Sequence, residues 1–364
     1  MSASFAPLRL EGDPYARGHA HGAALRPRIE AHLDAWLGSL AEAGLGEPRA
    51  YVAGLLAATD FRPAIERHTP DLWQEVQGIA AGAEVEPDLI FGLQLLDEEW
   101  AYRARTAGGG ALEKCSSIGV VSPGGPTWIG QTMDLGGYTD GFQALLAPAA
   151  DGDRPAALVF TVAGMIGLMG VNAAGVGVCV NSLPQLPSVP QGLPVAFVLR
   201  RLLQVTSLAE ACDLVLALPH ATNQHYLIAE PGGARSFEAS AAGVAEYRSP
   251  DPSRVLHTNH ALAAEGAPEP ASARVNSAAR LASLQARLAA GAAGLDEIKA
   301  ALSSCDDPEN PVCRIRGEPG GFSAFTTGSM ISALEPARIE AWVSPGPPSR
   351  AGYARFDLAA SGGQ

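Results

Sequence analysis

The residue whose surroundings best suit nucleophilic chemistry is Cys115, one of five cysteines in the sequence. It follows the glycine-rich segment 106–110 and begins an apolar stretch, with charged residues before it and two serines after it. A core cysteine more often lies within an apolar run, as Cys179 does. Because a cysteine becomes reactive when its environment favours the thiolate and leaves it accessible, we expect Cys115 to lie at an accessible strand edge. A chance cysteine at the start of a strand is the competing interpretation.

Three later polar segments are candidates to complete a site around Cys115, and one of them, Cys313-Arg314, lies in a loop rich in proline and glycine. A turn at 123–126 would pair the Cys115 strand with the strand that ends at Asp134, which brings a carboxylate close to the thiol. Another strand ends in His257-Thr-Asn-His260, with polar side chains where apolar ones are expected. Cysteine, histidine and asparagine together suit a papain-like enzyme, whereas a metal site would need a third clustered ligand. A histidine at a strand end is most often a structural hydrogen-bonding group, and we expect this of His257 and His260.

The composition narrows the class of protein. With 25 basic against 38 acidic residues the net charge is −13, which argues against nucleic acid or an anionic membrane as a partner. Hydrophobic residues make up 47% of the chain and charged residues 17%, enough for a large core. The odd number of cysteines, without a C-x-x-C pair or zinc-like histidine spacing, favours neither a disulfide framework nor a metal site, and we expect no cofactor. The first residues do not resemble a signal peptide, so we expect a cytoplasmic protein.

The uncharged segment from Ala156 to Val180 is long enough to cross a bilayer as a helix. It contains repeated glycines and β-branched residues, which favour strands. The apolar stretches 158–162 and 175–180 flank the turn signal Asn172-Ala-Ala-Gly175. We therefore expect a buried hairpin rather than a membrane helix, because strands buried on both faces read as continuous apolar runs.

Helices and strands are expected in separate blocks. The part before 106–110 is helical, with apolar residues on one helix face from Leu25 to Leu40 and helix starts at Thr69 and after Glu86. Strands dominate after this break, and such segregation predicts a layered α+β protein. The later helices are expected at about 194–203, from 207 and at 272–288, and the strands at 117–121, 127–132, 225–229, 236–238, 244–248, 255–258 and within 324–342.

Several motifs, taken together, resemble those of the acyl-coenzyme A:6-aminopenicillanic acid acyltransferase family, also called peptidase family C45, of N-terminal nucleophile (Ntn) hydrolases. No single motif is specific, since Gly-Val-Gly patterns are common, but their joint occurrence in the right order is. The segments that carry the resemblance are Gly18-His-Ala-His-Gly22, Cys115-Ser-Ser117, Gly130-Gln131 through Asp134, the stretch from Gly170 to Asn181, His257-Thr-Asn-His260, Cys313-Arg314 and Ser344-Pro-Gly-Pro-Pro348.

The resemblance implies a four-layer αββα sandwich, made as an inactive precursor that cuts itself before its nucleophilic cysteine. The bond cut here would be Lys114–Cys115, which divides the chain into a helical N-terminal segment, 1–114, and a part that carries both sheets and the nucleophile, 115–364. The two pieces stay together, so the cleaved N-terminal segment is itself a partner. The implied activity is hydrolysis or transfer of an acyl group, with a small-molecule amide or acyl donor as substrate.

Nucleophile and base belong to one residue in such a site. Cleavage frees the α-amine of Cys115, and a pKa of about 7.7–8.0 lets this amine take the proton of its own thiol without a histidine. By resemblance, Asp134 holds the ammonium form of the amine and Asn259 supplies the amide that binds the oxyanion. Ser117 is implied to assist self-cleavage. Two further candidates for substrate contacts are Ser240 and Arg314, the latter toward an anionic group.

Two positions depart from the pattern of the family. Lys114 stands before the nucleophile where the family usually has glycine, and a side chain there would slow or prevent self-cleavage. Thr132 replaces an asparagine in the strand that leads to Asp134, which would alter the pocket or the oxyanion shell. These departures keep open a second hypothesis, an unprocessed protein that retains the fold as a binding module. Such a module would have no unusually reactive cysteine.

Overall fold

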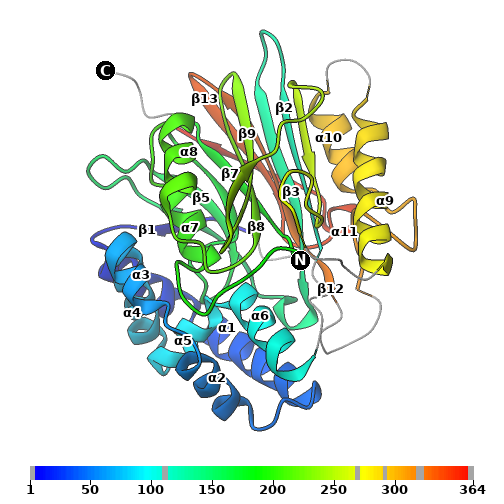
Figure 1. Cartoon of the computed structure of the whole chain (residues 1–364). Helices are drawn as coiled ribbons and strands as arrows, with labels where there is room; N and C mark the ends of the chain where they lie inside the picture. The colour runs from blue at the N-terminus through cyan, green and yellow to red at the C-terminus, as the bar shows by residue number, and fades with distance from the viewer. Residues whose placement is uncertain (1–4, 109–113, 267–270, 290–292, 317–323, 360–364) are drawn as a thin grey trace.

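Two β-sheets lie face to face in the computed structural model, which describes residues 5–108, 114–266, 271–289, 293–316 and 324–359 (Figure 1). Within this part, the larger sheet has eight strands, and every neighbouring pair is antiparallel except the first. In order across this sheet they are β1 (Leu8–Leu10), β4 (Gln143–Pro148), β5 (Ala157–Val162), β6 (Met169–Asn172), β7 (Gly177–Ser182), β8 (Gln224–Glu230), β9 (Gly233–Ser240) and β10 (Gly243–Glu246).

The smaller sheet has six antiparallel strands in the described part of the chain. Its order is β11 (Arg254–His257), β2 (Cys115–Val121), β3 (Thr127–Gly136), β12 (Ala324–Glu335), β13 (Arg338–Ser344) and β14 (Ala354–Leu358). Strands β2 and β3 contact β7 and β8 of the larger sheet. The side chains between the two sheets form the main apolar core, which is why these strands read as uncharged runs in the sequence.

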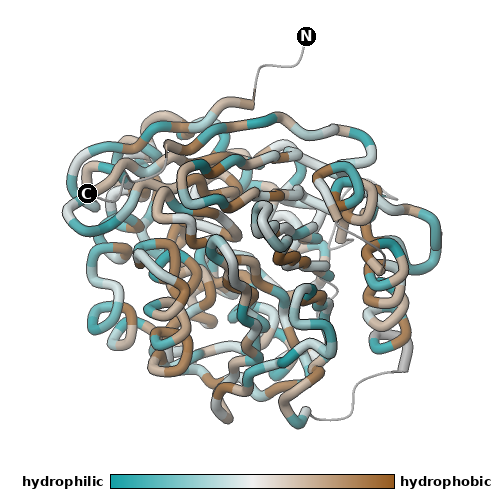
Figure 2. Tube along the Cα trace, turned by 90° about the horizontal axis from the view of Figure 1, so that it is seen from above, coloured by the Kyte–Doolittle hydropathy of each residue, from teal (hydrophilic) through white to brown (hydrophobic). Residues whose placement is uncertain are grey.

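Helices cover the outer face of each sheet and give the predicted αββα order (Figure 1). On the larger sheet lie α7 (Val195–Leu202) and α8 (Leu208–Ala217), and on the smaller sheet lie α9 (Ala271–Arg287), α10 (Leu295–Leu302) and the short α11 (Pro348–Ala351). Hydrophobic and hydrophilic positions interleave along these helices, as expected of elements with one buried face (Figure 2). Ser207 caps α8 by accepting a hydrogen bond from Glu210 N, as its sequence indicates.

The N-terminal segment is mostly helical, yet it is joined to the sandwich by hydrogen bonds. Strand β1 pairs in parallel with β4, so the segment before the predicted cut contributes a strand to the larger sheet. Thr69 precedes a helix as predicted, but its hydroxyl donates to the Ile65 carbonyl instead of capping that helix. The helices are α1 (Pro14–Glu42), α2 (Pro48–Ala57), α3 (Arg62–His68), α4 (Pro70–Ala83), α5 (Pro87–Leu93) and α6 (Leu96–Ala107).

The structure differs from the predicted elements in two details. The uncharged run 156–180 contributes β5, β6 and the first part of β7, so the turn at 172–175 joins β6 to β7 rather than β5 to β7. Strands β1 and β14 and helix α10 were not predicted, because they are short or only partly buried. Among the described residues, no helix is long and apolar enough to cross a membrane.

Helices α1 and α4 cross so closely that their glycines touch. A Cβ on Gly18 would lie 1.9 Å from the Glu75 carbonyl oxygen, and one on Gly78 would lie 2.2 Å from the Tyr15 carbonyl oxygen. Next to this crossing, the Gly164 amide donates to His21 Nε2, and burial lowers the pKa of His21 to about 3, so this imidazole is neutral. The Gly-His-Ala-His-Gly motif therefore has a structural explanation: it fastens α1 to α4 and to the larger sheet.

Substituting Gly18 by alanine will destabilise the protein. The new methyl group has no space at the helix crossing, and overpacking of this kind costs about 1–3 kcal/mol of unfolding free energy. Gly38→Ala is the matched control, because Gly38 lies on the same helix and a Cβ there meets nothing within 4 Å. Urea unfolding should show Gly38→Ala at or above wild-type stability. Equal midpoints for wild type and Gly18→Ala would contradict this account.

Candidate active site

Cys115 is the first residue of β2 and lies in the wall of a pocket between the N-terminal helices and the sheets. The expectation of an exposed strand edge is wrong, since only 6% of the residue is accessible. Its neighbour across the sheet is Met133 of β3, which lines the same pocket. Most of the wall is apolar and includes Leu96, Leu135, Met165, Leu168, Val180 and Leu199, while Asp97, Ser182 and Gln224 supply polar groups.

The pocket keeps the Cys115 thiol protonated. Burial and the nearby charge of Asp134 raise the pKa of this thiol to about 12, well above its ordinary value. A buried thiol of this kind is a poor nucleophile until a base takes its proton. The site therefore needs a base close to the sulfur.

The peptide bond between Lys114 and Cys115 is held on both sides. The Lys114 carbonyl oxygen accepts a hydrogen bond from the Asp134 amide at 3.0 Å. The Cys115 amide donates to Asn259 Oδ1 at 2.7 Å. The bond that would be cut is thus polarised at its oxygen, and its nitrogen is fixed next to its own thiol.

Asn259 follows β11 and contacts Ser182, a residue of the pocket wall. Its Nδ2 donates to the Ser182 carbonyl oxygen at 2.9 Å and lies 3.3 Å from Ser182 Oγ, and Ser182 lines the pocket. Its Oδ1 accepts hydrogen bonds, so the amide orientation is set and the N–H groups face the side of Ser182.

Arg280 of α9 is the site residue that sequence reasoning missed. Its guanidinium donates to the Cys115 carbonyl oxygen at 2.6 Å and to Asn259 Oδ1 at 2.8 Å. It also donates to Ser116 Oγ at 2.9 Å, and the residue is only 1% exposed. A signal was available in the sequence, because Arg280 falls on the same helix face as Leu284. A buried arginine on an apolar face needs several acceptors, and these are the residues that flank the nucleophile.

Asp134 lies on β3 beside the candidate cleavage site, as predicted. Its Oδ1 accepts a hydrogen bond from Thr326 Oγ1 at 2.6 Å, and its Oδ2 lies 3.8 Å from Arg314 Nε. Burial raises the pKa of this carboxyl to about 6, against the opposing effect of Arg314. Burial and the positive charges of Arg314 and Arg280 lower the pKa of Lys114 to about 8. Asp134, Lys114 and Arg314 therefore form one charged group at the start of β2.

Other predicted residues lie away from the pocket wall. Ser117 donates to Asn181 Oδ1 at 2.7 Å, between the two sheets. Ser240 accepts a hydrogen bond from the Ala242 amide at the end of β9. Thr132 Oγ1 donates to the Val312 carbonyl oxygen at 3.3 Å, and Thr132 is not among the residues that line the pocket. Arg314 contacts the site through Asp134 rather than through the pocket.

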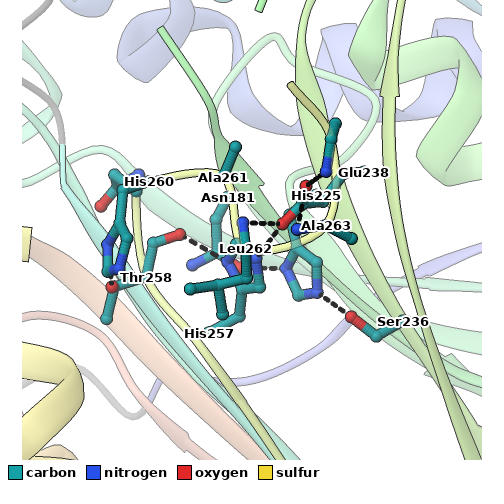
Figure 3. Close-up of polar contacts among 12 residues, drawn as sticks. Asn181, His225, Ser236, Glu238, His257, Thr258, His260, Ala261, Leu262 and Ala263 are labelled. Atoms are coloured by element: carbon teal, nitrogen blue, oxygen red, sulfur yellow. Dashed lines mark hydrogen bonds and ion pairs between the residues drawn. The ribbon is translucent and has the colours of Figure 1, made fainter. Parts of the chain in front are cut away.

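The two histidines of the His-Thr-Asn-His motif support the loop that carries Asn259 (Figure 3). His257 Nε2 lies 2.9 Å from Glu238 Oε1, and its Nδ1 lies 2.8 Å from the Thr258 carbonyl oxygen. Glu238 also accepts three backbone N–H groups, of residues 262, 263 and 264. His260 Nδ1 lies 2.7 Å from Ser277 Oγ. These partners fit the structural role expected from the sequence and leave the thiol without an imidazole partner among them.

A model of the acyl-coenzyme A:6-aminopenicillanic acid acyl-transferase family matches residues 123–343, more than half of the chain. The chain belongs to this family. The matched range includes Asp134, Asn259 and Arg280 and begins after Cys115. The family supports an enzyme of acyl transfer or amide hydrolysis.

A relative from Emericella nidulans agrees with this assignment. The 40 kDa form of acyl-coenzyme A:6-aminopenicillanic-acid-acyltransferase from Emericella nidulans is 28% identical over 325 residues, 87% of each chain. Among solved structures, a Caenorhabditis elegans ortholog of N-acylethanolamine-hydrolyzing acid amidase covers 67% of this chain and 100% of its own, with a TM-score of 0.47 and 13% identity. Penicillin V acylase from Agrobacterium tumefaciens covers 67% of this chain and 86% of its own, with a TM-score of 0.37 and 13% identity.

Replacing Arg280 by methionine will destabilise the fold and abolish activity. Each buried acceptor left without its donor costs about 1–3 kcal/mol of unfolding free energy, and the Asn259 amide loses the group that orients it. The matched control is Arg287→Met on the same helix, where a partly exposed ion pair with Asp306 is lost at a cost of about 1 kcal/mol or less. Denaturant unfolding and turnover of both variants check this. An active, stable Arg280→Met protein would show that the guanidinium does not organise the site.

Proposed function

We propose that this protein is a self-processing amide hydrolase or acyltransferase that uses Cys115 as an N-terminal nucleophile. The observation that carries the proposal is the Lys114–Cys115 peptide, held between the Asp134 amide and Asn259 Oδ1 beside the Cys115 side chain. The Asp134 contact continues the β2–β3 ladder, whereas the acceptor on the Cys115 amide is a side chain from the separate loop after β11. The family supports the same class of chemistry.

Self-cleavage begins with attack of Cys115 Sγ on the Lys114 carbonyl carbon. The C–N bond breaks, the Cys115 nitrogen takes the thiol proton, and a thioester joins Lys114 to the sulfur. The Asp134 amide, 3.0 Å from the carbonyl oxygen, stabilises the negative charge on that oxygen during the attack. Water then hydrolyses the thioester, which leaves a carboxylate on Lys114 and a free thiol and α-amine on Cys115.

The mature site uses the new α-amine as its base. With a pKa near neutrality, this amine takes the thiol proton that the pocket otherwise retains. The thiolate attacks a substrate carbonyl, and Asn259 Nδ2 donates to the oxyanion, a contribution of about 3–4 kcal/mol in comparable sites. Asp134 stabilises the ammonium form. The amine of the substrate leaves with the proton, and water or an acceptor amine then takes the acyl group from Cys115.

The pocket favours an apolar acyl group. Its wall is mostly aliphatic and aromatic, which compensates little for burying a charged chain. The substrate is therefore an N-acyl compound, or another acyl donor, with a hydrophobic acyl part. Transfer to an amine such as 6-aminopenicillanic acid, as the name of the Emericella relative indicates for that enzyme, is the variant in which an amine replaces water.

Cys115→Ala will remain one uncut chain without turnover, because the substitution removes the nucleophile of both reactions. Wild type should give two fragments by intact mass, the larger beginning at Cys115. Cys212→Ala is the matched control, since Cys212 is also buried but lies on α8 rather than in the pocket wall. This control should be cut and active. A wild-type chain that stays intact and shows no reactive thiol would instead favour the binding module.

Lys114→Gly will be processed faster than wild type. Glycine removes a half-buried side chain whose positive charge lies near Arg314 and Arg280, so the thiol reaches the carbonyl with less hindrance. The fraction of cut chain is followed by electrophoresis after purification from a short induction. Lys114→Met serves as the control, because it keeps the length of the side chain and removes only its charge. Slower cutting of the glycine variant would mean that the lysine side chain assists the reaction.

A further inference from the structure

A second hollow adjoins the pocket that contains Cys115. One face of α6 lines it through Ala104 and the exposed Arg105, and Ser188 and Asn223 lie on the opposite wall. Three residues line both hollows, namely Asp97, Trp100 and Ser182. The two hollows are therefore neighbours, and these three residues form the boundary between them. Cys115 lines only the first hollow.

Asp97 is the charged group at the boundary, and its partner is neutral. Its Oδ1 accepts a hydrogen bond from Gln224 Nε2 at 2.6 Å. Among the described residues, no cationic side chain forms an ion pair with it. Burial raises the pKa of Asp97, and the charge of Asp97 in turn raises the pKa of the adjacent buried Glu98. Asp134, by contrast, has Arg314 beside it. Asp97 is partly exposed, so its carboxylate remains open to a cation that a ligand supplies.

The polar groups of the boundary are arranged for a substrate that passes through it. Asn259 donates to Ser182, one of the boundary residues, so in the proposed mechanism the reacting carbonyl lies near the boundary. The apolar inner pocket takes the acyl part, and the amine part then extends past Asp97 into the second hollow. Trp100 adds a buried indole N–H that has no hydrogen-bond partner within the described part of the chain.

We propose that Asp97 is a specificity determinant that binds a positively charged group on the amine side of the substrate. This rests on the proposed function and adds the substrate class: N-acyl compounds whose amine part carries a second, protonated amino group. That ammonium completes the pairing of Asp97, and Gln224 holds the carboxylate toward it. The departing product is then a diamine, which leaves through the hollow that opens beside Arg105.

Three substrates that share one octanoyl group test this. In the first, one nitrogen of 1,2-diaminoethane is acylated and the other is a free ammonium group. In the second, n-propylamine is acylated, which leaves no charge. In the third, β-alanine is acylated, which leaves a carboxylate. Wild type should hydrolyse the diamine derivative with a kcat/KM about tenfold or more above the propyl derivative, the effect of one charge-assisted hydrogen bond, mainly through a lower KM. Asp97→Asn should remove this preference, so that the diamine and propyl derivatives are hydrolysed with equal kcat/KM. Asp213→Asn, at an exposed carboxylate on α8, is the control and should behave as wild type.

The outcomes separate this inference from the proposed function. Equal rates on the cationic and neutral substrates, or a preference for the β-alanine derivative, would overturn the role of Asp97 and leave the hydrolase intact. An equal loss of rate on all three substrates in Asp97→Asn would assign the residue to the general structure of the site. A wild-type chain that is uncut and hydrolyses none of the three would instead contradict the proposed function itself.

Discussion

The buried guanidinium of Arg280 joins the parts on which the site depends. It comes from α9, on the outer face of the smaller sheet, and donates both to the Cys115 carbonyl and to the Asn259 amide oxygen. It adds to the pairing of β11 with β2 and to the hydrogen bond between the Cys115 amide and Asn259. Burial lowers the pKa of Arg280 to about 10, which still leaves it charged at neutral pH. This positive charge also stabilises Asp134, so one residue sets both the geometry and the electrostatics of the site.

The electrostatics explain why such a site would use an amine rather than an imidazole as its base. The pocket raises the pKa of Cys115 to about 12, and the histidines near it have structural partners: His257 is bound to Glu238. A base that comes with the nucleophile itself needs no space in the pocket and no separate element to position it. The same burial that would exclude water from a bound acyl group therefore favours a base that is carried by the nucleophilic residue itself.

The sequence predicted the layers and the polar motifs well, because both depend on local signals. Runs of apolar residues identified the buried strands, and the turn at 123–126 correctly paired β2 with β3, which brought Asp134 next to Cys115. Arg280 was missed because its acceptors come from segments far away in the chain, and no local pattern reports them. The exposure of Cys115 was misjudged for a similar reason. The start of β2 is covered by α6, which belongs to an earlier part of the sequence, so the residues next to Cys115 do not indicate its burial.

The walls of the pocket come from both sides of the proposed cut. Helix α6 contributes Leu96, Asp97 and Trp100 from the N-terminal segment, whereas Cys115 and Met133 belong to the part that follows. Strand β1 pairs with β4, and the crossing of α1 with α4 anchors the helices to the larger sheet through His21. Breaking the Lys114–Cys115 bond removes one covalent link among these contacts and frees an amine inside a site that is already formed. The N-terminal segment thus lines the same pocket as Cys115, and the two products of the proposed cleavage would have to stay together to keep that pocket.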